Sequence, residues 1–184
     1  MGYALNDLGN LPVDANVRFY IFVVNGRFRE PLYEMMQENF FRIAADIGGQ
    51  AVIAVGTDPA AFTRAVARKY LGEGNSDAGF IDILPALLIT DTHPEQLTKA
   101  SMRLVVPLAD AESRMGGWHQ FFDALGRFAR GEDDEFLRRF ENRADLLDAA
   151  NRVLELRPGL FGISVNVNEL LEMASRRIAA RKTR

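Results

Sequence analysis

The chain has 184 residues, of which 48% are apolar and 26% charged, a composition that indicates a folded domain with a real core. Its formal net charge of −3 argues against a nucleic-acid-binding protein, which is usually basic. It contains no cysteine, so disulfides, thiol redox chemistry and thiolate metal sites are excluded. With no apolar run near the ~20 residues that cross a bilayer and no secretory signal in residues 1–16, we expect a cytoplasmic protein.

The first third of the chain predicts a leader, a strand and a helix. Residues 1–16 have no apolar periodicity and predict a loose leader. Val17–Val24 is a nearly continuous β-branched and aromatic run, which is typical of a strand buried on both faces. From Pro31 onward, apolar residues recur at helical spacing until Gly48 and Gly49, which predicts one helix over this stretch.

The next elements are a second strand and a second helix. Gln50–Gly56 has the pattern of a buried strand. Asp58 and Pro59 follow it as a helix N-cap and first helical residue, and the helix should end at Gly72. Residues 72–79 are rich in glycine and polar residues, which predicts a loop.

A proline begins the third predicted strand. Pro85 directly precedes the apolar run Ala86–Thr90. Thr92 and Glu95 have the spacing of a capping box, which predicts one or two helical turns. Met102–Val106 is the fourth predicted strand.

The last third of the chain predicts helices around one strand. Aromatic and apolar residues from Trp118 to Ala129 recur at helical spacing, and Gly131 should end this amphipathic helix. A further helix is expected from Asp133 to Leu156. Phe161–Asn168 alternates apolar and polar residues, which predicts a strand with one buried face, followed by a final helix.

This order of elements resembles the thioredoxin-like fold, which is an α/β fold of three layers, α/β/α, around a mixed sheet. In that family the third strand opens with a proline that follows a cis peptide bond and lies beside the loop after the first strand. Pro85 matches this proline, and Asn25–Glu30 stands where the family carries its CxxC motif. The resemblance covers residues 17–130 and implies a domain of that extent. We expect residues 131–184 to form a helix-strand-helix extension packed on the same core.

Because both cysteines of that motif are missing, thioredoxin activity is excluded. The segments VRFYIFVVNG, LPALLITDTHPEQL and MRLVVPL are similar in outline to the KaiB family of circadian-clock proteins, whose thioredoxin-like domain binds partner proteins. The closing PGLFGISVNVNELLE is similar to accessory modules of bacterial signalling and defence proteins.

These resemblances imply a non-catalytic protein-binding or regulatory module without metal or cofactor, and they leave self-association open beside a different protein partner. The implied binding residues are Asn25, Gly26, Arg27, Arg29, Leu84 and Pro85. A second candidate surface is the strand Phe161–Val167, which could add to the sheet of a partner.

The two histidines, His93 and His119, are the candidate general bases or metal ligands. Neither has a second ligand at a metal-binding spacing, so we expect both to be structural or solvent-exposed. Arg27 and Arg29 precede a predicted helix N-terminus, where anions bind; the alternative is an exposed loop with solvated arginines.

The competing hypothesis is an α/β enzyme or sensor for a phosphorylated or nucleotide-like small molecule. Its site would combine Arg27, Arg29, Asp58, Asp91 and His93 in one pocket about 10 Å across. In an all-parallel sheet, Asp58 and Asp91 would both follow carboxyl ends of strands. In a thioredoxin-like sheet the third strand is reversed, which would separate Asp91 and His93 from the rest.

Overall fold

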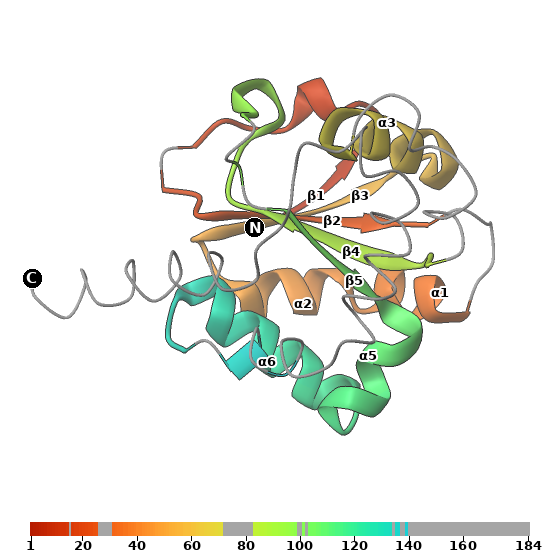
Figure 1. The fold of residues 1–184 in the computed structure, drawn as a ribbon, viewed down its shortest axis with the longest axis vertical. Helices are drawn as coiled ribbons and strands as arrows, with labels where there is room; N and C mark the ends of the chain where they lie inside the picture. Colours follow the sequence, from red (N-terminus) through yellow and green to blue (C-terminus); the bar gives the residue numbers. More distant parts are fainter. Residues whose placement is uncertain are drawn as a thin grey trace, which may run out of the picture.

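The computed structural model describes residues 1–14, 16–25, 31–71, 83–98, 101, 103–133, 135–136 and 139. They form an α/β fold around a mixed sheet with the strand order β1-β3-β2-β4-β5 (Figure 1). The strands are β1 (Gly2–Leu5), β2 (Phe19–Val24), β3 (Ala51–Gly56), β4 (Ala86–Thr90) and β5 (Arg103–Pro107). β1, β3 and β2 are parallel, whereas β4 is antiparallel to β2 and β5 is antiparallel to β4.

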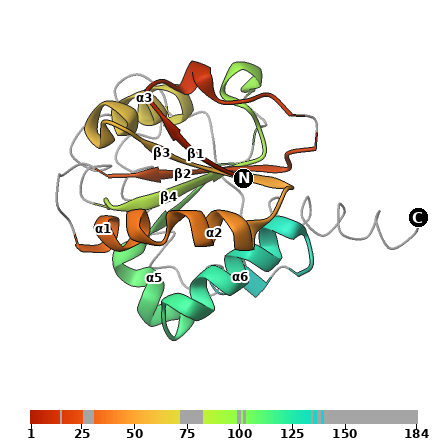
Figure 2. The same ribbon diagram turned by 180° about the vertical axis from the view of Figure 1, so that it is seen from behind.

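Helices cover both faces of the sheet. One face carries α3 (Pro59–Leu71) and the short η1 (Leu8–Asn10), and the other carries α1 (Pro31–Glu38), α2 (Phe40–Ile47), α5 (Leu108–Met115) and α6 (Trp118–Arg130). Figures 1 and 2 show these two layers above and below the strands. The short η2 (Pro94–Gln96) follows β4.

The central strand β2 supplies both halves of the core. Phe19, Ile21 and Val23 pack toward α2 and α6, while Tyr20, Phe22 and Val24 pack toward α3. All six residues are buried, which confirms the two-sided burial that the continuous apolar run predicts. Burying one large apolar side chain stabilises the fold by about 1.5–3 kcal/mol, so this strand anchors both layers.

The N-terminal residues are part of the sheet, and the prediction of a loose leader over residues 1–16 is wrong for its first half. β1 pairs in parallel with β3 from Gly2↔Ile53 to Leu5↔Gly56. Leu8 and Leu11 are buried in the core on the α3 side. The sequence does not reveal β1, because a strand of four residues is too short to show an alternation of apolar and polar residues. Its partner β3 also lies some fifty positions further along the chain.

Two helical predictions need correction. The single helix expected after Pro31 is interrupted at Asn39, whose side-chain Nδ2 donates to the carbonyl of Met35 at 2.8 Å. The sequence does not predict the helix α5, because Pro107 after an apolar run indicates only the end of a strand. Pro107 is also the N-cap of α5. The amphipathic helix ended by Gly131 is confirmed as α6, and Gly131 adopts a left-handed φ of 70°.

The expected C-terminal extension falls mostly outside the described residues. Its predicted strand Phe161–Asn168 and final helix lie there entirely. At its start, Phe136 is buried and lies 5.6 Å from Phe121 and 5.7 Å from Phe128, between ring centroids. Arg127 pairs with Asp133 at 2.7 Å and thereby ties the turn after α6 to that helix. None of the described helices is long and apolar enough to cross a membrane.

The close approach of β3 to α3 gives a stability prediction at Gly56. A Cβ on Gly56 would lie 2.2 Å from the Cβ of Phe62, whereas a Cβ on Gly49 would meet nothing within 4 Å. We expect Gly56→Ala to lower the free energy of unfolding by about 1–3 kcal/mol because it overpacks the core. Gly49→Ala should change it by less than about 0.5 kcal/mol. Urea denaturation of both variants checks this, and equal losses would contradict the packing described.

Candidate functional site

The carboxyl end of β2 and the start of β4 meet at one end of the sheet. The antiparallel register closes with Val24↔Ala86, so Asn25 and Pro85 are the next residues on adjacent strands. The Leu84–Pro85 peptide bond is cis, the isomer that the resemblance implies. The carbonyl of Pro85 accepts a hydrogen bond from the Leu108 amide at 2.8 Å, which links this end to α5. We call this region the Asn25/Pro85 end.

Helix α3 holds the Asn25/Pro85 end through Thr63. The amide of Asn25 donates to Thr63 Oγ1 at 2.8 Å, and this hydroxyl donates to the carbonyl of Asn25 at 2.7 Å. Asn25 exposes 1% and Thr63 5% of its surface. Both main-chain polar groups of Asn25 are therefore paired away from water, as buried backbone requires.

The structure brings together three of the six predicted binding residues. Asn25, Leu84 and Pro85 lie at the same end of the sheet. Gly26, Arg27 and Arg29 are outside the described residues. Thr63 was not predicted, since a threonine next to Phe62 on a helix gives no signal of a partner 38 positions earlier.

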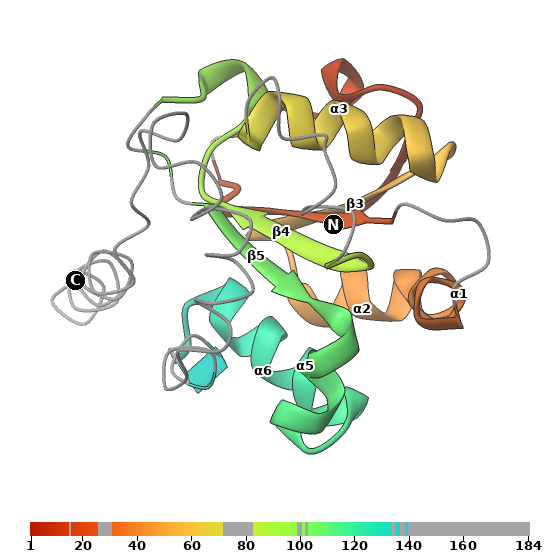
Figure 3. The same cartoon turned by 45° about the vertical axis from the view of Figure 1, so that its right-hand side comes forward.

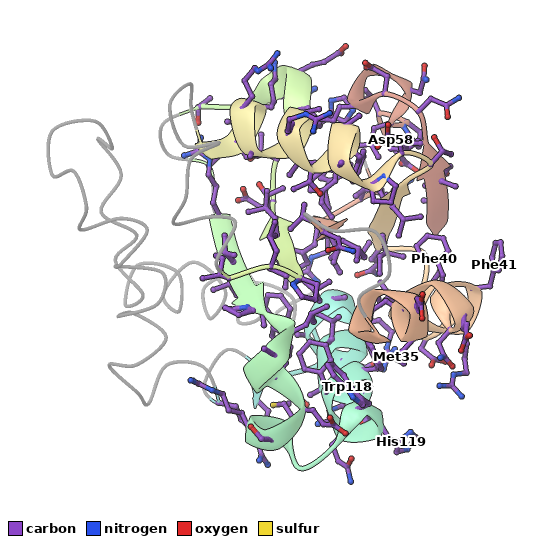
Figure 4. All side chains as sticks on the ribbon, turned by 90° about the vertical axis from the view of Figure 1, so that its right-hand side faces the viewer. Met35, Phe40, Phe41, Asp58, Trp118 and His119 are labelled. Atoms are coloured by element: carbon purple, nitrogen blue, oxygen red, sulfur yellow. The ribbon has the colours of Figure 1, made fainter. Side chains whose placement is uncertain are left out.

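Asp58 lies at the same end as Asn25 and caps α3. Its carboxylate accepts a hydrogen bond from the amide of Ala61 at 3.0 Å, which confirms the predicted N-cap. In Figure 4 it marks the start of α3. The carboxylate of Asp58 is thus engaged in capping the N-terminus of α3.

Asp91 and His93 lie at the opposite end of the sheet. Along the β2–β4 pairing, the register runs over four residues from Ala86 at Val24 to Thr90 at Tyr20, or roughly 13 Å at 3.3 Å per residue. Independently, α3 separates its N-cap Asp58 from Tyr70 by about 18 Å at 1.5 Å per residue, and the Tyr70 hydroxyl donates to the Thr92 carbonyl at 3.2 Å. Asp58 and His93 therefore do not share the ~10 Å pocket that the enzyme hypothesis requires.

His93 has a structural role, as predicted. It exposes 2% of its surface, its Nε2 lies 3.2 Å from the carbonyl of Leu11, and its Nδ1 accepts from the Glu95 amide at 3.3 Å. Its ring packs edge-on against Tyr20 at 5.5 Å between centroids. His93 thereby joins the loop after η1 to the start of η2.

The capping box predicted at Thr92 is wrong by one residue, because His93 is the N-cap of η2. The hydroxyl of Thr92 donates instead to Asp91 Oδ1 at 2.7 Å. Asp91 is thus held within the turn that follows β4.

His119 is exposed on α6 beside Trp118 (Figure 4). Trp118 stacks on Phe122 at 5.9 Å between centroids and meets Phe121 edge-on at 5.7 Å, so it belongs to the core contacts of α6. Within the described ranges, no three His, Asp or Glu side chains gather as metal ligands.

Comparison with known proteins identifies no family. No family model, no curated protein and no solved structure matches the chain. Function is therefore inferred from the arrangement of its own residues.

The clamp between Thr63 and Asn25 gives a second prediction. Thr63→Val keeps the shape of the side chain but removes its hydroxyl, which leaves a buried amide and carbonyl without this partner. Each such group costs about 1–3 kcal/mol, so we expect a loss of at least about 2 kcal/mol in the free energy of unfolding.

Thr63→Ser is the matched control, since it keeps the hydroxyl and loses one methyl group, worth about 1 kcal/mol. Both variants are measured by denaturant unfolding. A serine variant that is less stable than the valine variant would show that shape, and not hydrogen bonding, holds this end.

Proposed function

We propose that the chain is a non-catalytic, thioredoxin-like binding or regulatory module whose recognition surface is the Asn25/Pro85 end, extended along the sequence by Gly26, Arg27 and Arg29. The observation that carries this proposal is the reversal of β4 against β2 and β3. That reversal agrees with a thioredoxin-like sheet, in which the proline-led third strand starts beside the end of the first.

The groups at this end favour binding over catalysis. The chain has no cysteine, and the carboxylate of Asp58 caps α3. His93, a candidate base, lies at the far end of the sheet and contacts Leu11 and Glu95. The hydroxyl of Thr63, the other reactive group described at this end, is hydrogen-bonded to the backbone of Asn25.

The sequence that follows Asn25 suggests the chemistry of the partner. Arg27 and Arg29 add two cations next to this end in the sequence. Arginine binds carboxylates in a planar, two-point geometry, and complementary charge steers association. A protein partner with an acidic surface fits this combination. A phosphorylated small molecule would use the same cations, but Asp58 and His93 are too far apart to act on it together.

Replacing both cations tests the proposal. We expect the double variant Arg27→Ala/Arg29→Ala to bind the partner at least about tenfold more weakly than the unmodified chain. This loss of affinity corresponds to about 1.4 kcal/mol of binding free energy. The measurement is affinity co-purification with quantitative mass spectrometry, followed by titration of the identified partner.

The control is Arg42→Ala/Arg68→Ala, which removes the same charge from exposed positions on α2 and α3. It should retain the partner fully. An equal loss of partner binding in both double variants would show that net charge alone causes the effect. Full binding by both variants would show that this surface does not contact the partner.

A further inference from the structure

The strand β1 has an open outer edge in the described sheet. It is the last strand on the side opposite β5, and β3 is its neighbour. The amide of Ile53 on β3 donates to the carbonyl of Met1 at 2.8 Å. Because backbone groups point to alternate sides along a strand, the N–H and C=O groups of Gly2 and Ala4 face outward. β1 contains neither a charged residue nor a proline, the residues that commonly block pairing at an edge.

The helix α2 lies beside this edge. A Cβ on Gly2 would come within 2.7 Å of the Cβ of Ala44, so β1 contacts α2 at this point. On the other side of the helix, a Cβ on Gly126 of α6 would lie 3.2 Å from the carbonyl oxygen of Asp46. α2 packs over β1 and β3, whereas α5 packs over β4 and β5. Figure 3 shows α5 below β5 and α2 farther from that edge.

Phe41 is a large apolar side chain that projects into solvent on the β1 side of α2. It exposes 83% of its surface, and in Figure 4 it points away from the molecule, unlike Phe40. With 3.6 residues per turn, Phe41 lies about 60° around the helix from Ala44 and about 140° from Asp46. It therefore projects past β1 and not toward α6. Ala45, about one turn after Phe41, is exposed as well.

The exposed apolar surface continues onto β1. Ala4 is exposed and points to the same face of the sheet as Gly2, because alternate residues of a strand share a face. That face is the one on which α2 packs. We call Ala4, Phe41 and Ala45 the β1/α2 flank. Neighbouring exposed apolar side chains, in contrast to a single one, indicate a surface for association.

We propose that the β1/α2 flank joins two copies of the chain about a twofold axis. β1 of one copy pairs antiparallel with β1 of the other, so that Gly2 lies opposite Ala4 and Tyr3 lies opposite Tyr3. In this register the outward N–H and C=O groups of Gly2 and Ala4 exchange hydrogen bonds in both directions. The two five-stranded sheets then form one continuous sheet.

The position of α2 favours a second copy over other occupants. Because α2 packs over β1 and β3 together, its axis lies about half a strand spacing inside β1. Paired strands are about 4.8 Å apart, so the twofold axis brings the two α2 helices to roughly 10 Å, a distance at which helices pack. Phe41 of each copy then meets the small Ala45 of the other. A bare peptide strand on β1 would pair with its backbone but leave Phe41 in solvent.

This interface is separate from the proposed recognition surface and does not depend on it. The Asn25/Pro85 end is formed by β2 and β4, and β3 lies between β1 and β2. Pairing along the outer edge of β1 leaves β4 uncovered. A dimer of this kind would therefore carry two copies of the recognition surface.

Sedimentation equilibrium of the unmodified chain over a range of concentrations tests the proposal. We expect the mass to rise with concentration toward twice that of one chain. Phe41→Glu should raise the dissociation constant of the dimer by at least about tenfold without unfolding the chain, since this side chain is exposed. Ala4→Pro should act in the same direction, because proline has no amide hydrogen to donate across the edge.

The matched control is Val13→Glu, since Val13 is another exposed large apolar residue, at 61%, and lies outside the β1/α2 flank. It should leave the dissociation constant unchanged. A chain that stays monomeric up to about 1 mM overturns the proposal. So does a dimer that Phe41→Glu does not weaken, or one that Val13→Glu weakens equally.

The absence of cysteine allows a direct test of the register. In the proposed pairing the Cα atoms of Tyr3 and its symmetry mate are about 4.5 Å apart, which is within the range that a disulfide bridges. Tyr3→Cys should therefore give a covalent dimer on mild oxidation, whereas Val13→Cys should remain largely monomeric. Equal cross-linking of both variants, or a Tyr3→Cys chain that dimerises without cross-linking, would contradict this arrangement.

Discussion

The antiparallel pairing of β2 with β4 is the constraint on which the rest of the molecule depends. Every residue of its five pairs, from Tyr20↔Thr90 to Val24↔Ala86, is buried. Because β4 is reversed, each end of the sheet collects residues from different parts of the sequence. A parallel β4 would place Asp91 beside Asp58, and the chemistry available at that end would be that of a pair of carboxylates. The direction of one strand thus decides which functional groups meet.

Much of the sheet could be predicted because each of these strands corresponds to a short apolar run in the sequence. The runs that became β2 and β3 are apolar, and β4 is apolar up to its last residue, Thr90, as is typical of strands buried on both faces. The helix α6 was equally clear, since its apolar residues repeat with the helical period and Gly131 provides the left-handed end. At the site, the sequence predicted the proximity of Asn25 and Pro85 only through a resemblance.

The missed features depend on contacts between distant residues. β1 has four residues and exists through its pairing with β3, and Thr63 matters because it meets the backbone of Asn25. Arg103 begins a strand, and a charged residue there is normally assigned to the surface. Its burial follows from pairing opposite Thr90 under α3, which no local pattern reveals.

The composition of β5 has a consequence for how the molecule behaves at high concentration. Among the described strands β5 lies at one edge of the sheet, and the backbone of an edge strand is a potential template on which other chains can pair. It is five residues long, begins with the charged Arg103 and ends with Pro107, which has no amide hydrogen to donate. A short strand with a charge at one end and a proline at the other is a poor template. Arg103 and Pro107 therefore make this edge of the sheet a poor starting point for aggregation.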